Sequence, residues 1–169
     1  MEYENSKKFG DIAEENILNR IRIKYPHAYI DDNSHPNSNW DIFIPEINDG
    51  VEVKMDYKSK ETGNLVVEVE MNDKPSALSI TKSKYWVFVT GYRYIWIKPI
   101  QIYRFLEQHP YYNRVSFVGE GDNTSKKAYL INHDIFVKWI YSLDKEDGWV
   151  EMIKPTDELY FNNMKKLFN

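Results

Sequence analysis

The sequence predicts a single α/β domain in which helices flank a mixed central β-sheet. Three observations predict it: an amphipathic N-terminal segment, a run of short strands with charged residues on one face, and a return to helical patterns in the second half. At 169 residues the chain is long enough for one domain with a proper core, and too short for two. We therefore expect one domain over residues 1–169, with the motifs in residues 6–90.

The composition is that of an ordinary folded protein and excludes several classes. No apolar run approaches the ~20 residues of a membrane helix, and the N-terminus lacks a secretory apolar core, so we expect a cytoplasmic protein without a membrane partner. The absence of cysteine excludes disulfides and thiolate zinc sites. A net charge of −4 argues against a protein that coats nucleic acid. A nuclease can still be acidic overall, because its phosphate-binding lysines need only be gathered near the site.

Hydrophobic periodicity predicts the order of the elements. Apolar residues at helical spacing predict a first helix over residues 6–23, and a turn-rich segment follows that contains His35, a weak candidate for phosphate contact. Strands are expected at residues 28–30, 40–45, 51–55, 65–71, 85–90, 93–98, 114–118, 128–131 and 149–153, with a hairpin connection at 56–64. Further helices are expected at residues 99–108, at 133–143 after an Asn132 cap, and after Thr156; the first of these should bury Ile100, Ile102, Tyr103 and Leu106.

Two of these strands carry acids where a plain core strand would carry none. In residues 51–55 alternation sends the apolar side chains to one face and Glu52 and Lys54 to the other. In residues 40–45 the isoleucines take the buried face and Asp41 the opposite one. Two carboxylates and one ammonium can therefore share a surface.

This combination suits phosphate chemistry with a divalent cation. Mg²⁺ binds through one or two carboxylates, keeps several waters and often lies beside a phosphate, and Asp41 and Glu52 meet that demand. Lys54 lies on the same face, where it can orient a water, help to deprotonate it, or hold the phosphate.

The connection between the two strands leaves two registers open. If residues 45–48 form the connection, Asp41 lies directly opposite Glu52. If Asp49-Gly50 instead forms a two-residue hairpin turn, Asp41 is displaced by six residues, or ~20 Å. A shared metal site requires the first register or a bulged form of it.

Asp41, ten intervening residues and then Glu52-Val53-Lys54 resemble the signature of the PD-(D/E)XK nuclease superfamily, which has the restriction-endonuclease-like fold. Trp40 stands where that family often has a proline. The resemblance implies that Asp41, Glu52 and the Val53 carbonyl hold one or two Mg²⁺ ions, which Mn²⁺ can replace. It also implies that DNA is the partner and that Lys54 activates the attacking water.

The first helix carries a second, shorter resemblance. Gly10 followed by Glu14 resembles the Gly-x-x-x-Glu opening helix of Holliday-junction-resolvase-like members. Glu14 lies at the edge of the apolar stripe and Glu15 points further toward solvent, so Glu14 is the expected additional metal ligand and catalytic residue; a solvated acidic face is the alternative. The resemblance implies a structure-selective endonuclease of DNA recombination or repair, and a homodimer if it makes paired cuts.

Two further groups are candidates beside this site. Glu68 and Glu70 should line one face of their strand and compete for the metal. Hydroxyls and lysines in the segment after Asn72 suit phosphate oxygens, and similar nucleases grip the DNA backbone there; an ordinary basic surface is the alternative. The expected substrate-binding residues are Ser76, Thr81, Lys82 and Lys84.

The resulting hypothesis is a Mg²⁺-dependent deoxyribonuclease, most simply an endonuclease. One alternative is a catalytically silent member of the same fold that binds nucleic acid or a protein. Another is a structural α/β domain whose acids only solvate a sheet face. Endonuclease or exonuclease action, and DNA or RNA as substrate, stay open at this point.

Overall fold

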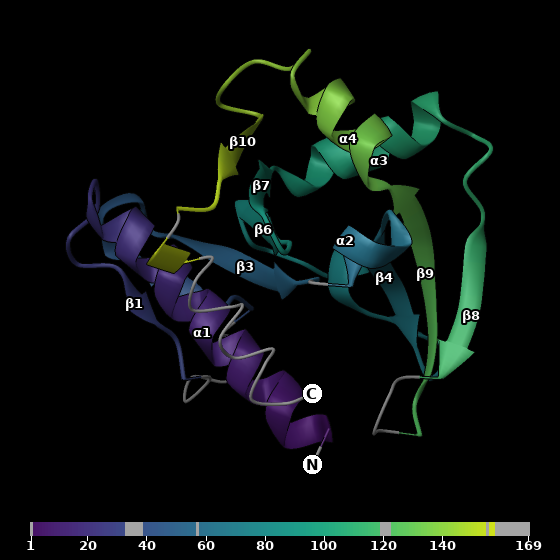
Figure 1. Ribbon diagram of the computed structural model, residues 1–169, viewed down its shortest axis with the longest axis horizontal. Coiled ribbons are helices and arrows are strands. Elements are labelled where there is room, and N and C mark those ends of the chain that lie inside the picture. The colour runs from purple at the N-terminus through teal and green to yellow at the C-terminus, as the bar shows by residue number, and fades with distance from the viewer. Residues whose placement is uncertain (1, 33–38, 57, 119–122, 155, 158–169) are drawn as a thin grey trace.

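The computed structural model describes residues 2–32, 39–56, 58–118, 123–154 and 156–157 (Figure 1). His35 lies outside these ranges. Of the expected helix after Thr156, only residues 156–157 lie within them. None of the helices described is both long and apolar enough to cross a membrane. The elements are α1 (Glu2–Arg22), β1 (Tyr29–Ile30), β2 (Ile42–Ile44), the 3₁₀ helix Pro45–Ile47, β3 (Asp49–Met55), α2 (Ser59–Thr62), β4 (Asn64–Met71), β5 (Lys74–Pro75), the 3₁₀ helix Ala77–Ser79, β6 (Tyr85–Val89), β7 (Arg93–Ile97), α3 (Pro99–Gln108), β8 (Arg114–Val118), β9 (Ser125–Asn132), α4 (His133–Ile140) and β10 (Gly148–Met152).

The strands form two sheets within a single α/β domain. The first sheet has the order β1-β2-β3-β6-β7-β10, in which β3 and β6 are parallel and the other neighbours antiparallel. This confirms the expected mixed sheet, with β6 near its centre. The second sheet, β5-β4-β9-β8, is antiparallel and was not expected. The predicted hairpin connection at residues 56–64 is wrong, because this segment contains α2 and leads from β3 into the other sheet.

Two apolar clusters cover the two faces of the six-stranded sheet. On one face α1 packs its predicted stripe against the sheet, with Ala13, Ile17 and Ile21 buried against Ile42 and Val51. On the other face the second sheet, α3 and α4 bury a separate cluster. Figure 1 shows the resulting arrangement, with α1 along one side of β3 and the remaining helices and sheet on the other.

Helix α3 lies where the sequence predicted it but buries a different face. Gln101, Ile102 and Phe105 are buried, whereas Ile100 is 53% exposed and Tyr103 40% exposed. The expected inward position is therefore wrong for Ile100 and Tyr103. The physical reason is the partner: the ring of Phe105 packs against aromatic side chains of α4, and this contact sets the rotation of the helix.

The β2–β3 connection adopts the first of the two predicted registers. Residues Pro45–Ile47 and Asn48, which has a left-handed backbone with φ of 49°, form the connection. Asp49 and Gly50 are already part of β3, so the alternative two-residue turn is wrong. The paired residues are Ile42 with Val51, Phe43 with Gly50, and Ile44 with Asp49.

Candidate active site

The candidate site lies where the chain enters β2. The β2–β3 ladder ends with the pairing of Ile42 with Val51, so Asp41, the residue before Ile42, lies beside β3 next to Glu52. The Asp41 N–H still donates to the Val51 carbonyl, at 3.0 Å, but the next ladder bond is made by the Asp41 side chain, whose Oδ2 accepts from the Val53 N–H at 2.7 Å. Because the N–H and C=O of a strand residue point to the same side, the Val53 carbonyl faces this edge as well.

Glu14 approaches the same place from α1. Burial, followed by repulsion from Asp41 and other carboxylates that include Glu52, raises the pKa of Glu14 to about 7. Burial and repulsion from Glu52 likewise raise the pKa of Asp41 to about 6, although the Val53 N–H and the Lys54 ammonium act in the opposite direction. Three carboxylates from α1, β3 and the segment before β2 therefore lie within electrostatic reach of one another.

Lys54 occupies a position between Glu52 and Trp86. Its Nζ donates to Glu52 Oε1 at 2.6 Å and lies 5.0 Å from the centroid of the Trp86 ring. The parallel pairing of β3 with β6 sets this arrangement, since it aligns Glu52 with Trp86 and Lys54 with Phe88. The acid and the base of the predicted motif are thus in direct contact.

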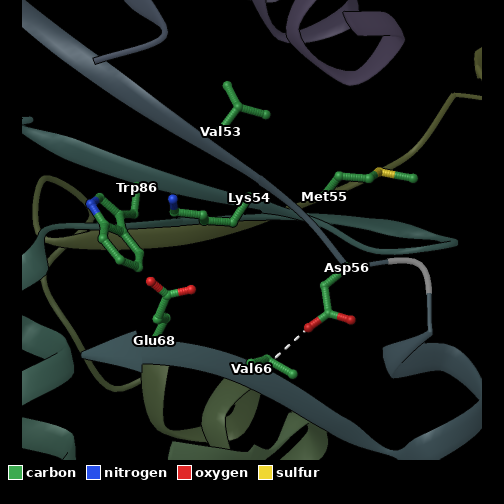
Figure 2. Close-up of a pocket in the computed structure, with 7 residues that line it drawn as sticks. All are labelled: Val53, Lys54, Met55, Asp56, Val66, Glu68 and Trp86. Carbon is green, nitrogen blue, oxygen red and sulfur yellow. Dashed lines mark hydrogen bonds between the residues drawn. The ribbon is translucent and has the colours of Figure 1, made fainter. Parts of the chain in front are cut away.

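A pocket of about 280 Å³ adjoins Lys54 and separates the end of β3 from β4. Figure 2 shows Lys54 and Glu68 directed toward this space from opposite strands, while the Val53 side chain points to the other face of β3. Asp56 closes one end, where its Oδ2 accepts from the Val66 N–H at 2.9 Å. The lining residues are Val53, Lys54, Met55, Asp56, Val66, Glu68 and Trp86.

The two acids of β4 do not share a face, contrary to the sequence-based expectation. A register irregularity pairs Glu68 with Ala128 and Glu70 with Lys127, which are consecutive residues of β9 and so point to opposite faces. Glu68 faces the pocket. Glu70 instead bonds Lys127 Nζ at 2.9 Å and Arg114 at 2.8 Å, and these cations lower its pKa.

The expected substrate-binding residues fall into two groups. Ser76 is buried and donates to Glu68 Oε1 at 2.7 Å, and the Thr81 hydroxyl accepts from the Trp86 indole N–H at 2.9 Å. Both hydroxyls therefore have partners within the protein. Lys82 and Lys84 are exposed and can reach a ligand at the surface.

Sequence reasoning missed the residues that hold the segment before Asp41. The Trp40 indole N–H donates to buried Asp31 at 3.0 Å, and its ring stacks on Phe43 with centroids 5.2 Å apart. The Asp31 N–H in turn donates to the Asp41 carbonyl at 2.8 Å. Trp86 was missed as a neighbour of Lys54 because nothing in the sequence shows which strand pairs with β3 in parallel.

The donor set of the site fits a hard cation such as Mg²⁺ or Mn²⁺. Its ligands are carboxylate and carbonyl oxygens, and Mg²⁺ needs only one or two protein carboxylates in addition to water. Over the described part of the chain, no three acidic or histidine side chains are close enough together to hold a metal ion as they stand. Asp41 and Glu52 are thus the pair that could hold the ion, with Glu14 nearby.

Fold and site together define an α/β protein with an acidic cluster and a lysine at the edge of a mixed sheet. No protein-family model, curated protein or solved structure matches the chain. Its function is therefore inferred from the geometry of the site.

Proposed function

We propose that this protein is a Mg²⁺-dependent deoxyribonuclease, an endonuclease of the PD-(D/E)XK type with a restriction-endonuclease-like fold. The observation that carries the proposal is the approach of Asp41 to β3 on both sides of Glu52: its N–H donates to the Val51 carbonyl and its Oδ2 accepts from the Val53 N–H. Lys54 lies on the same face as Glu52 and contacts it. An acid pair can hold a metal ion that activates water, and an adjacent ammonium can orient that water or hold the phosphate.

Each residue has a distinct role in this proposal. Asp41, Glu52 and the Val53 carbonyl would hold Mg²⁺, and Glu14 would hold a second ion or its water. When bound, the ion supplies positive charge that lowers the pKa of water and stabilises charge on the phosphate. Lys54 orients the attacking water, and the exposed Lys82 and Lys84 contact the DNA backbone.

The reaction is an in-line hydrolysis. The water oxygen forms a bond to phosphorus while the bond from phosphorus to the leaving ester oxygen breaks. The water gives up a proton to solvent, and the leaving oxygen takes a proton up. The proposal includes a structure-selective, resolvase-like substrate preference, because Gly10 and Glu14 resemble the opening helix of resolvase-like members. Paired cuts would need a homodimer, which sedimentation velocity would detect.

The test is cleavage of a labelled panel of duplex, single-stranded and branched-junction DNA and of RNA. Each substrate is incubated with Mg²⁺, with Mn²⁺ and with EDTA, using the unaltered protein, Lys54→Ala and, as a control, Lys138→Ala, which changes an exposed lysine of α4. We expect metal-dependent cleavage of DNA that Lys54→Ala abolishes and Lys138→Ala retains. Full cleavage by folded Lys54→Ala would contradict the role of Lys54.

A second candidate is a catalytically silent binding protein with the same arrangement of elements. Two observations favour it: the short Lys54–Glu52 contact, and the lack of a ready three-ligand group among the residues described. It predicts DNA or protein binding that EDTA does not affect, and no cleavage of any substrate in the panel. Metal-dependent turnover would exclude it.

A further inference from the structure

The hydroxyl groups of residues 76–84 are bonded within the protein. Their partners lie on both sheets and on the segment that leads to Asp41. Ser76 donates to Glu68, Ser79 to the Val69 carbonyl at 2.8 Å, and Ser83 to the Asn39 carbonyl at 3.1 Å, while Thr81 accepts from Trp86. Residues 76–84 therefore connect β4, β6 and the segment before Asp41, and each hydroxyl fixes one neighbouring group through its hydrogen bond.

The Thr81–Trp86 bond is the one that leads to the candidate catalytic lysine. Trp86 is only 1% exposed, and its ring packs edge-on against Phe88 with centroids 6.0 Å apart. The Thr81 hydroxyl satisfies the buried indole N–H, which would otherwise lack a partner. Packing and this bond together set the plane of the ring.

The face of that ring lies against the Lys54 ammonium. At 5.0 Å from the centroid, Nζ is within the range where an aromatic face attracts a cation. A lysine side chain is a flexible stem with a compact charge, so a single contact with Glu52 does not define its position. The indole face provides the second contact, on the side that lines the pocket.

We propose that Thr81 and Trp86 are positioning residues for Lys54. The Thr81 hydroxyl sets the orientation of the indole, and the indole face sets the place of the ammonium beside Glu52. The effect on cleavage rests on the proposed nuclease function. The effect on the position of Lys54 does not, and it can be measured separately.

The first measurement is an NMR spectrum of protein labelled with ¹³C-lysine, with the Lys54 signal assigned by its loss in Lys54→Arg. Protons above an aromatic face are shifted upfield by the ring current. We expect an upfield Lys54 Hε signal in the unaltered protein and in Thr81→Ser, which keeps the hydroxyl. In Thr81→Val the signal should move to the position of the exposed lysines, whereas Ser79→Ala, which removes a hydroxyl bonded elsewhere, should leave it unchanged.

The second measurement is the cleavage rate of the same variants. Displacing a reacting group by about 1 Å can cost up to about 100-fold, so we expect Thr81→Val to lower kcat by roughly 10- to 100-fold with KM unchanged. Thr81→Ser and Ser79→Ala should retain the rate. If Thr81→Val does not fold, Trp86→Phe tests the same bond, because it removes the indole N–H and keeps an aromatic face.

The outcomes separate the two proposals. An upfield Lys54 signal that responds to Thr81→Val, in a protein that cleaves no substrate, would overturn the nuclease and leave the positioning role. The positioning role would be overturned if the protein cleaves DNA and Thr81→Val changes neither the Lys54 signal nor kcat. Where Trp86→Phe replaces Thr81→Val, the same result in that variant has the same meaning. Either result would leave the nuclease proposal in place.

Discussion

The Asp41 carboxylate makes a structural hydrogen bond and is also a proposed metal ligand. Its Oδ2 accepts from the Val53 N–H and so completes the edge of β3 where β2 no longer pairs with it. Burial and, after it, the nearby charge of Glu52 raise its pKa. An amide at this position keeps a hydrogen-bond acceptor and removes the charge.

Asp41→Asn should therefore keep the fold and lose the stabilisation by Mg²⁺. A ligand that binds only the folded state stabilises it by about 2.7 kcal/mol at a concentration of 100 times Kd. We expect Mg²⁺ to raise the thermal midpoint of the unaltered protein relative to EDTA, and not that of Asp41→Asn. Asp144→Asn, at an exposed position, is the control; an equal rise in all three proteins would show that Mg²⁺ binds elsewhere.

Glu14 makes the stability depend on pH. Its pKa is raised from 4.5 to about 7, so between these values the folded protein binds more protons than the unfolded chain. The free energy of unfolding must then fall as the pH rises through this window. Glu14→Gln has no charge to repel Asp41, so we expect it to lose less stability between about pH 5 and about pH 8.

Thermal unfolding across this pH range, without added metal, measures the effect. Glu107→Gln is the control, because Glu107 is an exposed glutamate of α3 and is not among the charges that act on Glu14. It should behave as the unaltered protein does. The same decline of the thermal midpoint in Glu14→Gln and in the unaltered protein would refute the electrostatic contact between α1 and β3.

At the scale of elements, the entry of the chain into β2 depends on a close approach between Trp40 and Gly50. A Cβ atom at Gly50 would lie 2.3 Å from Trp40 Cγ, which is closer than atoms can pack. Trp40 also donates to Asp31 and stacks on Phe43, so it cannot move without breaking these contacts. The absence of a side chain at Gly50 thus lets Trp40 cover β3 directly before Asp41.

Gly50→Ala should accordingly destabilise the protein, by about 1–3 kcal/mol as for other overpacked sites, and weaken the response to Mg²⁺. Urea unfolding measures the change. Gly10→Ala is an informative control because nothing lies within 4 Å of its added Cβ and the residue is inside α1. For Gly10→Ala we expect the free energy of unfolding to rise by about 0.5–1 kcal/mol, since alanine favours a helix more than glycine does. Unchanged stability of Gly50→Ala would show that Trp40 can move without cost.

In the molecule as a whole, aromatic side chains of β6, α3 and α4 form the centre of the apolar cluster that both sheets share. Phe136 of α4 packs edge-on against Phe88 of β6, with centroids 6.3 Å apart, and against Phe105 of α3 at 4.9 Å. All three rings are fully buried, in the same cluster as Leu65 of β4. Since the inner face of each sheet is covered by the same cluster, neither sheet should remain folded alone.

Phe136→Ala is therefore expected to destabilise both sheets together, by about 3–5 kcal/mol. Urea unfolding followed by tryptophan fluorescence and by far-ultraviolet circular dichroism should give one coincident transition. Ile135→Ala, at a neighbouring position that is 40% exposed, should change stability much less. Two separate transitions would mean that the sheets fold as independent units.

Local sequence patterns are sufficient to predict the individual elements and the motif. Helical spacing predicted α1 and its buried stripe, and alternation predicted β3 with Glu52 and Lys54 on one face, because both periodicities follow from the geometry of a single element. The Asn132 cap was also predictable and is confirmed, since its side chain accepts from the Ile135 N–H at 3.0 Å. The sequence left two registers of β2 and β3 open, because either residues 45–48 or the Asp49-Gly50 dipeptide could form the connection.

The contacts between distant elements are set by the folded structure. The fold determines the β2–β3 register, forms the second sheet and turns α3 so that Phe105 is buried. The parallel pairing of β3 with β6 places Trp86 beside Lys54. The fold also brings Glu14 to Asp41 and separates Glu68 from Glu70 by a bulge. Periodicity reports which face of an element is apolar, whereas the partner of that face depends on the packing of the whole chain, and no local pattern encodes it.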